Sequence, residues 1–216
     1  MKLIILFAVI LFGWSNTHAQ SNDIPKQLTQ YLFAAFAEGS VLQKSGAITK
    51  TQLNYNTLTQ EMIFKQGDQY LALDRVWEID TVFLNNKKFV PGNNIFYEVG
   101  TKTPVALLIQ HTSDIIPQGS ETGFGKSQTT AVTNVTDLKR SGRAYALSLP
   151  DEYTFKSKTA YILKKEENFI QVINLKDVKK VFAGKEALID EYTKKNKVNF
   201  KKDDDVIQLV EFCNSN

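Results

Sequence analysis

Short strand-like runs separated by brief turns are the feature that most constrains the fold of this 216-residue chain. Between about Tyr31 and Asn174, runs rich in Val, Ile, Thr, Tyr and Phe are separated by Gly, Asn, Asp and Lys turns. A parallel crossover needs about a dozen residues or more. These short links therefore predict antiparallel neighbours in a sequential meander, and an open meander of this length should curl or split into two layers.

The turns place the individual strands. One run alternates Trp77, Ile79, Thr81 and Phe83 with polar residues or Val82, a pattern typical of a half-buried strand. Strands are expected at 47–56, 60–65, 70–73, 77–83, 89–90, 95–99, 105–110, 159–163 and 169–173.

Residues 175–216 change to helical spacing. Helices are expected at 175–183, ended by Gly184, at 185–197, and from Asp203 onward, where carboxylates complement free amides and the helix dipole. Short amphipathic helices need a packing partner, most simply the sheet. The apolar stripe of the last helix consists of Val206, Leu209, Val210 and Cys213.

The expected fold is therefore α+β: an antiparallel curled β-meander or two-layer β domain with short C-terminal helices packed on it. Residues 1–19 form a signal peptide, 20–174 the β domain and 175–216 the helical segment packed on the same domain. Residues 116–143 are rich in Gly, Ser and Thr and predict a long loop with a weak strand at 129–133. Loops of this length are often functional or mobile.

The N-terminus has the layout of a secretory signal peptide. Lys2 precedes an apolar run at 3–12, and Ala19 ends a small-residue exit before Gln20. The run is shorter than the roughly 20 apolar residues of a membrane span. We therefore expect cleavage after Ala19 and export to the periplasm, the cell surface or the medium, with no transmembrane span after signal removal. No cysteine lies at the cleavage point, so acylation there is not expected.

Composition excludes some function classes. The chain is 43% hydrophobic and 23% charged, so it can form a core. It carries 26 basic and 23 acidic residues; removing the leader takes away Lys2 and no acid, which leaves +2. Nucleic-acid binding needs a concentrated basic footprint, so no nucleic-acid partner is expected. A lone cysteine, Cys213, cannot form an internal disulfide.

Residues 119–127 resemble a phosphate-binding loop but miss its spacing. That motif needs four residues between its first glycine and Gly-Lys-Ser, whereas Gly119 leaves five and the spacing of four falls on Ser120. The β-branched segment that comes next is unsuited to the required helix. Ser120 also lacks the residue that a nucleophile elbow places between glycine and serine. A plain loop is the better interpretation.

Other catalytic or metal-binding patterns are incomplete. His111 lies near Asp114 and is the only histidine after the leader, so a Ser-His-Asp hydrolase using His111 and the 116–143 loop stays open as an alternative. Cys213 lies on an apolar stripe, which indicates a buried structural thiol. One His and one Cys do not supply the three or four ligands of a zinc site. No catalytic, cofactor-binding or metal-binding residue is therefore assigned, and no cofactor is expected.

Carboxylates give weak signals. Asp203, Asp204 and Asp205 are contiguous, unlike the alternating ligands of a calcium loop, and fit helix capping better. Glu121 could pair with Asp151 or Glu152 for glycoside hydrolysis, but a chain with 23 acids offers many such pairs. The run 134–136 matches a glycosylation acceptor, which matters only in a eukaryotic secretory host.

Aromatic residues are frequent on the expected strands, where they usually form core. A curled sheet could instead enclose an aromatic-lined cavity for an apolar small molecule or lipid. The aromatic residues concerned are Tyr31, Phe33, Phe36, Tyr55, Phe64, Tyr70, Trp77, Phe83, Phe89, Phe96 and Tyr97.

Several phrases together resemble a group of exported proteins of Gram-negative bacteria, over nearly the whole mature chain. They are LNYNTLTQEMIF at 53–64, IDTVF at 79–83, FVP at 89–91, FYEV at 96–99, GFGKSQT at 123–129 and KVNFKKDDDVIQLV at 197–210. The resemblance implies a cell-envelope protein and brings no catalytic residue. The leading hypothesis is an exported, non-enzymatic binding or structural module whose partner is an envelope protein or surface component. A carrier of an apolar molecule and a hydrolase are the alternatives.

Overall fold

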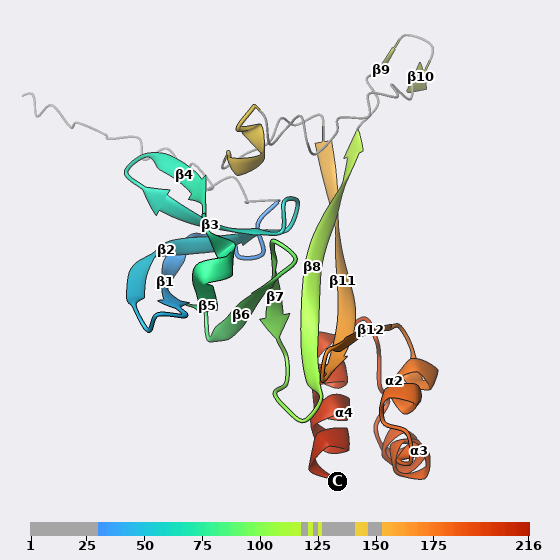
Figure 1. Ribbon diagram of the computed structural model, residues 1–216. Helices are drawn as coiled ribbons and strands as arrows, with labels where there is room; N and C mark the ends of the chain where they lie inside the picture. Colours follow the sequence, from blue (N-terminus) through green and yellow to red (C-terminus); the bar gives the residue numbers. More distant parts are fainter. Residues whose placement is uncertain (1–29, 118–120, 123–124, 127–140, 147–152) are drawn as a thin grey trace, which may run out of the picture.

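A ten-stranded antiparallel sheet dominates the computed structural model, which describes residues 30–117, 121–122, 125–126, 141–146 and 153–216 (Figure 1). Its order is β12-β11-β8-β7-β6-β5-β1-β2-β3-β4. The strands are β1 (Ala37–Gln43), β2 (Ile48–Asn56), β3 (Glu61–Gln66), β4 (Gln69–Ala72), β5 (Ile79–Leu84), β6 (Lys87–Gly92), β7 (Ile95–Val99), β8 (Ala106–Pro117), β11 (Tyr153–Lys165) and β12 (Asn168–Val172).

Antiparallel pairing is confirmed, but the single sequential meander is wrong at one place. β1 to β4 form one meander and β5 to β8 another, and β5 pairs with β1 instead of β4. Outside the strand pairing, β7 also contacts the β2–β3 turn: the backbone N of Phe96 donates to Gln60 O over 3.2 Å. The expected α+β class holds, because three short helices come after the strands in the described part of the chain.

The central strand β1 has little strand-like character in sequence. Its glycine, Gly39, is required by packing: a Cβ there would lie 2.7 Å from the Phe83 carbonyl oxygen and 2.8 Å from Leu53 Cδ1. A side chain at this position would push β1 away from β5. The glycine in β1 thus reflects how closely its neighbours approach.

The expected alternation of the 77–83 strand is interrupted by a bulge. The β1–β5 register shifts so that Leu42 faces Thr81 while Gln43 faces Ile79, leaving Asp80 as an extra residue. Such a bulge reverses the side-chain phase of the residues after it. Ile79 is buried before the bulge and Val82 after it, whereas Phe83 is partly exposed.

One face of the sheet carries both main cores, and we call it the packed face. Cross-strand partners form a buried row across seven strands, from β1 to β12. At one end of the row, β1–β7 enclose the strand-rich core; at the other, β8, β11 and β12 pack on the helices to form the helical core. The row is Val41, Val82, Phe89, Glu98, Ile109, Tyr161 and Val172.

The helices are α2 (Leu175–Val181), α3 (Glu186–Lys195) and α4 (Asp203–Ser215). The Asn174 side chain caps α2 by accepting from Asp177 N, and Gly184 beyond its end has a φ of +88°, which favours glycine. The expected stripe of α4 is confirmed: Val206, Leu209, Val210 and Cys213 are all buried in the helical core. In the described residues, no helix is long and apolar enough to cross a membrane.

Two strands run longer than the sequence indicated. β8 extends to Pro117 and β11 begins at Tyr153, and their register continues to Tyr153↔Pro117. The first residues of the expected 116–143 loop therefore belong to a strand. Within the same segment, β9 (Glu121–Thr122) pairs with β10 (Gly125–Lys126). The weak strand expected at 129–133 and the signal peptide lie outside the described residues.

Candidate functional site

A charged residue lies in the middle of the buried row. Glu98 on β7 is flanked across the ladder by Phe89 on β6 and Ile109 on β8, both fully buried. Its side chain is only 4% exposed. A buried carboxylate is costly unless it is paired, so the side chains around Glu98 decide what this position can do.

Two basic side chains meet this carboxylate from the neighbouring strands. Lys87, at the start of β6, donates to Oε1 of Glu98, while Nε2 of His111 on β8 lies 2.8 Å from Oε2. His111 is 7% exposed, whereas the Lys87 side chain is partly open to solvent. We call these three residues the buried charge cluster.

The electrostatics of the cluster follow from these contacts. Burial alone raises the pKa of the Glu98 carboxyl, but hydrogen bonds from His111 and Lys87, with their positive charge, outweigh it and hold that pKa below its usual value. An ionised carboxylate only accepts hydrogen bonds, so Nε2 of His111 carries the proton directed at Glu98.

The cluster resembles a carboxylate–imidazole pair, but its surroundings are those of a packed core. The Tyr55 hydroxyl lies 3.2 Å from the Phe96 carbonyl and 3.1 Å from the His111 carbonyl, so it bonds backbone and not the imidazole. Ser113 Oγ lies 2.7 Å from Thr57 Oγ1. These hydroxyls are occupied by hydrogen bonds within the fold, so none of the three is directed at the His111 imidazole.

Asp114, the nearby carboxylate that a Ser-His-Asp hydrolase could have used, does not reach His111. Asp114 is the third residue along β8 from His111, and its carboxylate forms an ion pair with Lys158 on β11, where both side chains are about half exposed. His111 instead uses Glu98, which the sequence did not single out. The alternation of side chains in the 95–99 strand could have indicated this role. Glu98 shares a face with Phe96, so a charged residue occupies a core position.

Other candidates from the sequence have structural roles or lie outside the described residues. Burial raises the pKa of the Cys213 thiol to about 11, which makes it a poor nucleophile. Asp203 and Asp205 bond Tyr161 and the backbone N of Asn199, each near the start of α4. Ser120, Asp151, Glu152 and residues 134–136 lie outside the described residues, and Glu121 is described in its backbone alone.

The aromatic side chains at the centre of the strand-rich core are packed as core residues. Tyr55, Phe89 and Phe96 are fully buried, and the first two rings stack at 5.7 Å between centroids. Among the residues that the structure describes, no three His, Cys, Asp or Glu side chains gather as metal ligands would.

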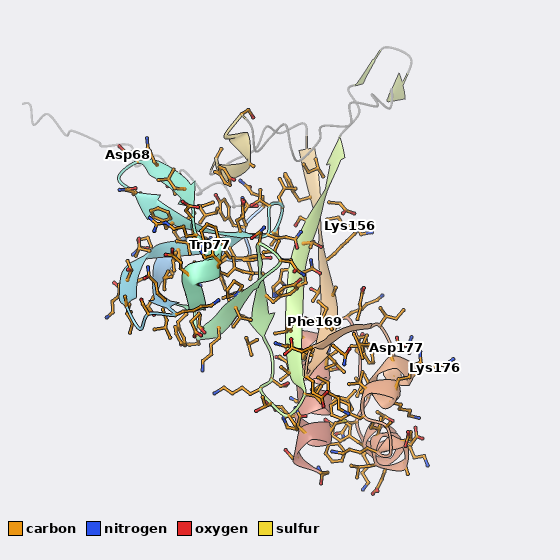
Figure 2. All side chains as sticks on the ribbon, in the orientation of Figure 1. Asp68, Trp77, Lys156, Phe169, Lys176 and Asp177 are labelled. Carbon is orange, nitrogen blue, oxygen red and sulfur yellow. The ribbon has the colours of Figure 1, made fainter. Side chains whose placement is uncertain are left out.

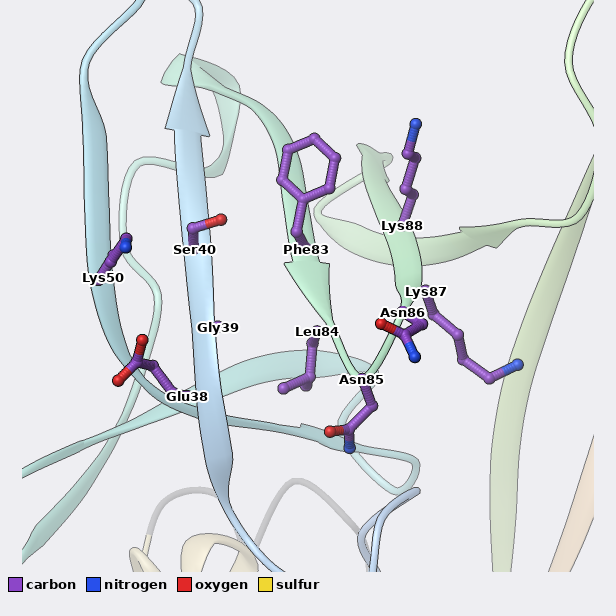
Figure 3. A pocket seen from close by; sticks show the side chains of 10 residues that line it. All are labelled: Glu38, Gly39, Ser40, Lys50, Phe83, Leu84, Asn85, Asn86, Lys87 and Lys88. Atoms are coloured by element: carbon purple, nitrogen blue, oxygen red, sulfur yellow. The ribbon is translucent and has the colours of Figure 1, made fainter.

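Open hollows lie at the margins of this core. One of about 650 Å³ is bordered by β1, β2 and the β5–β6 turn (Figure 3). In that view the Lys87 side chain extends from the turn away from Ser40 and Lys50. A second, of about 720 Å³, lies between this turn and α4 and is bordered by Glu98 and Lys87. The buried charge cluster thus reaches solvent through Lys87.

Among the residues that the structure describes, exposed apolar side chains gather on and directly after the edge strand β12. Phe169 is 58% exposed, Ile170 38% and Ile173, directly after the strand, 68%. β12 ends the sheet order and pairs with β11 alone in the described sheet. The Lys164 ammonium lies 5.2 Å from the centre of the Phe169 ring. An exposed apolar edge strand offers backbone groups and side chains to another chain.

Comparisons with protein-family models, with curated proteins and with solved structures find no match for this chain.

Proposed function

We propose that this protein is an exported, non-catalytic binding module of the bacterial cell envelope. In this proposal, β12 docks an extended segment of a partner envelope protein as an added strand. The observation that carries it is the apolar edge, where Phe169, Ile170 and Ile173 are exposed within five consecutive residues. The signal-peptide layout and the resemblance to exported Gram-negative proteins support the compartment.

The chemistry of the edge fits a peptide strand with apolar side chains. Phe169 and Gln171 face one side of β12, with Ile173 in the same phase, while Ile170 and the buried Val172 face the other. A partner strand would gain backbone hydrogen bonds along the edge and apolar contacts on both sides.

Capture from Gram-negative envelope extracts tests this proposal. The bait is the chain without residues 1–19, as wild type and as the double variant Phe169→Lys with Ile173→Lys. A second double variant, Ile48→Lys with Trp77→Lys, is the matched control, because Ile48 is 64% and Trp77 66% exposed and neither lies on β12. Phe169 and Trp77 are labelled on separate parts of the molecule in Figure 2.

We expect wild type and the control to capture the same specific partner. The β12 variant should capture at least tenfold less of it. Equal capture by all three baits would rule out β12 as the docking edge. A protein that recovers no partner while turning over a substrate would contradict the non-catalytic assignment. In that case His111→Ala would decide whether the buried charge cluster is responsible.

A further inference from the structure

A hollow of about 580 Å³ opens into the strand-rich core from solvent, bordered by β1, β2, β3 and the segment leading into β5. Its floor is apolar: Val41 and Ile79 are buried members of the core, and Phe64 and Leu73 are partly buried against it. Small-molecule sites typically enclose about 300–1,000 Å³ and have mostly apolar linings. This hollow has the size and the floor of such a site.

The walls add uncharged hydrogen-bonding groups. Thr49 and Thr51 lie on β2 and share the face of Val41, as their register with β1 shows. The amides of Gln43 and Gln66 border the same space. Hydroxyl and amide groups both donate and accept hydrogen bonds, so the walls suit a polar head that does the same.

The rim is a turn in a strained conformation. Arg75 has a φ of 46°, in the left-handed region that non-glycine residues seldom adopt, and its backbone N donates to Asp74 Oδ1 over 2.7 Å. Such outliers gather at ligand clamps and binding sites. Arg75 also pairs with Glu78 at 3.6 Å. Charged residues of both signs border the hollow: Lys50, Lys65 and Arg75 are basic, and Asp74 and Glu78 are acidic.

We infer that this hollow binds one uncharged amphiphile with an apolar body and a hydroxyl or carbonyl head. The body packs on Val41, Phe64 and Leu73, and the head bonds to Thr49 and Thr51. The wall residues that meet the head carry no charge, so they offer a charged head no ion pair. Lys50 borders this hollow as well, but it lies between Thr49 and Thr51 on β2, so alternation directs its side chain to the opposite face of the strand. This site is separate from β12 and is independent of the proposed docking edge.

A series of primary alcohols tests the inference on the wild-type chain without residues 1–19. Isothermal titration with 1-hexanol, 1-octanol and 1-decanol should show one site, with affinity rising about fourfold per added methylene. Decanoate should bind more weakly than 1-decanol. An affinity independent of chain length would overturn the apolar body, and tighter binding of decanoate would overturn the uncharged head.

A filling variant tests the location. Thr51→Phe places a ring in the hollow, whereas Gln52→Phe adds the same ring on the opposite face of β2. The first should weaken 1-decanol binding at least tenfold, and the second should leave it unchanged. Undiminished binding by Thr51→Phe would place the site elsewhere. If that variant fails to fold, the alcohol series on wild type still decides whether an amphiphile binds.

Discussion

The two cores on the packed face are built differently. The helical core buries aliphatic side chains such as Ile109, Leu163 and Leu209, and Tyr161 bonds Asp203 with its hydroxyl. The strand-rich core and its margin bury hydrogen-bonded polar side chains and one charge cluster, namely Asn54, Asn56, Thr57, Glu98, His111 and Ser113. One half should therefore respond mainly to lost volume, and the other to lost hydrogen bonds and charge.

The polar contacts of the strand-rich half also hold segments that are distant in sequence. Asn56 Oδ1 accepts from the backbone N of Leu58 and Thr59, while its Nδ2 donates to Ala144 O over 2.8 Å. Tyr31 donates to Tyr145 O over 2.9 Å. In this half, hydrogen bonds of buried side chains therefore add to apolar contact in fixing where the chain lies.

The largest effect is expected from a cavity in the helical core. Leu209→Ala on α4 should lower the free energy of unfolding by about 2–5 kcal/mol, because Leu209 is fully buried. Urea denaturation measures this, and the loss should be the same at pH 4 and pH 7. Glu211→Ala, exposed on the same helix, should stay within about 0.5 kcal/mol of wild type. A strongly pH-dependent loss for Leu209→Ala would contradict the contrast between the cores.

Neutralising the buried carboxylate should have the next largest effect. Glu98→Gln should lower the free energy of unfolding by about 1.5–3 kcal/mol. An amide has one oxygen acceptor and no negative charge, so it cannot accept charge-assisted hydrogen bonds from both Lys87 and His111. Glu78→Gln is the control, since Glu78 is exposed and pairs with Arg75 at 3.6 Å. It should change unfolding by less than about 1 kcal/mol. Equal losses for the two variants would show that burial adds nothing to the Glu98 contacts.

A smaller effect is expected on the pH dependence of stability, and it should not exceed the loss caused by Glu98→Gln. The folded pKa of Glu98 lies below its unfolded value of 4.5. This contribution to stability is fully present above pH 4.5 and is lost as the pH falls through the lower folded pKa. Urea denaturation between pH 6 and pH 3 should therefore show wild type approaching Glu98→Gln as the solution becomes more acidic. A difference between them that stays constant would show that Glu98 is not the responsible group.

The smallest effect is expected at an exposed ion pair between β8 and β11, the two neighbouring strands that pack on the helices. Lys158→Ala should change the free energy of unfolding by about 0–0.5 kcal/mol beyond any change in strand preference, because Lys158 and Asp114 are each about half exposed. Denaturation in low and high salt measures it. A loss of stability as large as that of Glu98→Gln would mean that exposed and buried ion pairs contribute alike. Electrostatics would then no longer distinguish the two cores.

Local sequence patterns predicted much of the fold. The antiparallel class, the 95–99 strand and the buried stripe of α4 follow from alternation, turns and helical spacing. The β1–β5 pairing could not be predicted, because it depends on a close approach at Gly39 that only the neighbouring β5 and β2 reveal. The burial of Val82 in place of Phe83 depends on a bulge opposite β1, which the 77–83 sequence does not encode by itself.

The candidate site was less predictable than the fold. His111 could be noticed as the lone histidine after residue 19, but the carboxylate near it in the sequence was Asp114. Alternation along β8 places side chains an odd number of residues apart on opposite faces, so His111 and Asp114 diverge. Glu98 reaches His111 only because β7 and β8 pair in one register. The exposed apolar edge of β12 likewise became visible only when the sheet order showed that this strand ends the sheet.

One strand, β8, belongs to both cores. Leu107 and Ile109 pack among the helices, while His111 and Ser113, on the same face, join the polar contacts of the strand-rich half. Unfolding of either half would remove contacts from this shared strand and destabilise the other half. The protein should therefore lose its structure in one cooperative step, and cutting the chain before α2 would uncover Ile109 and destabilise the region that holds His111.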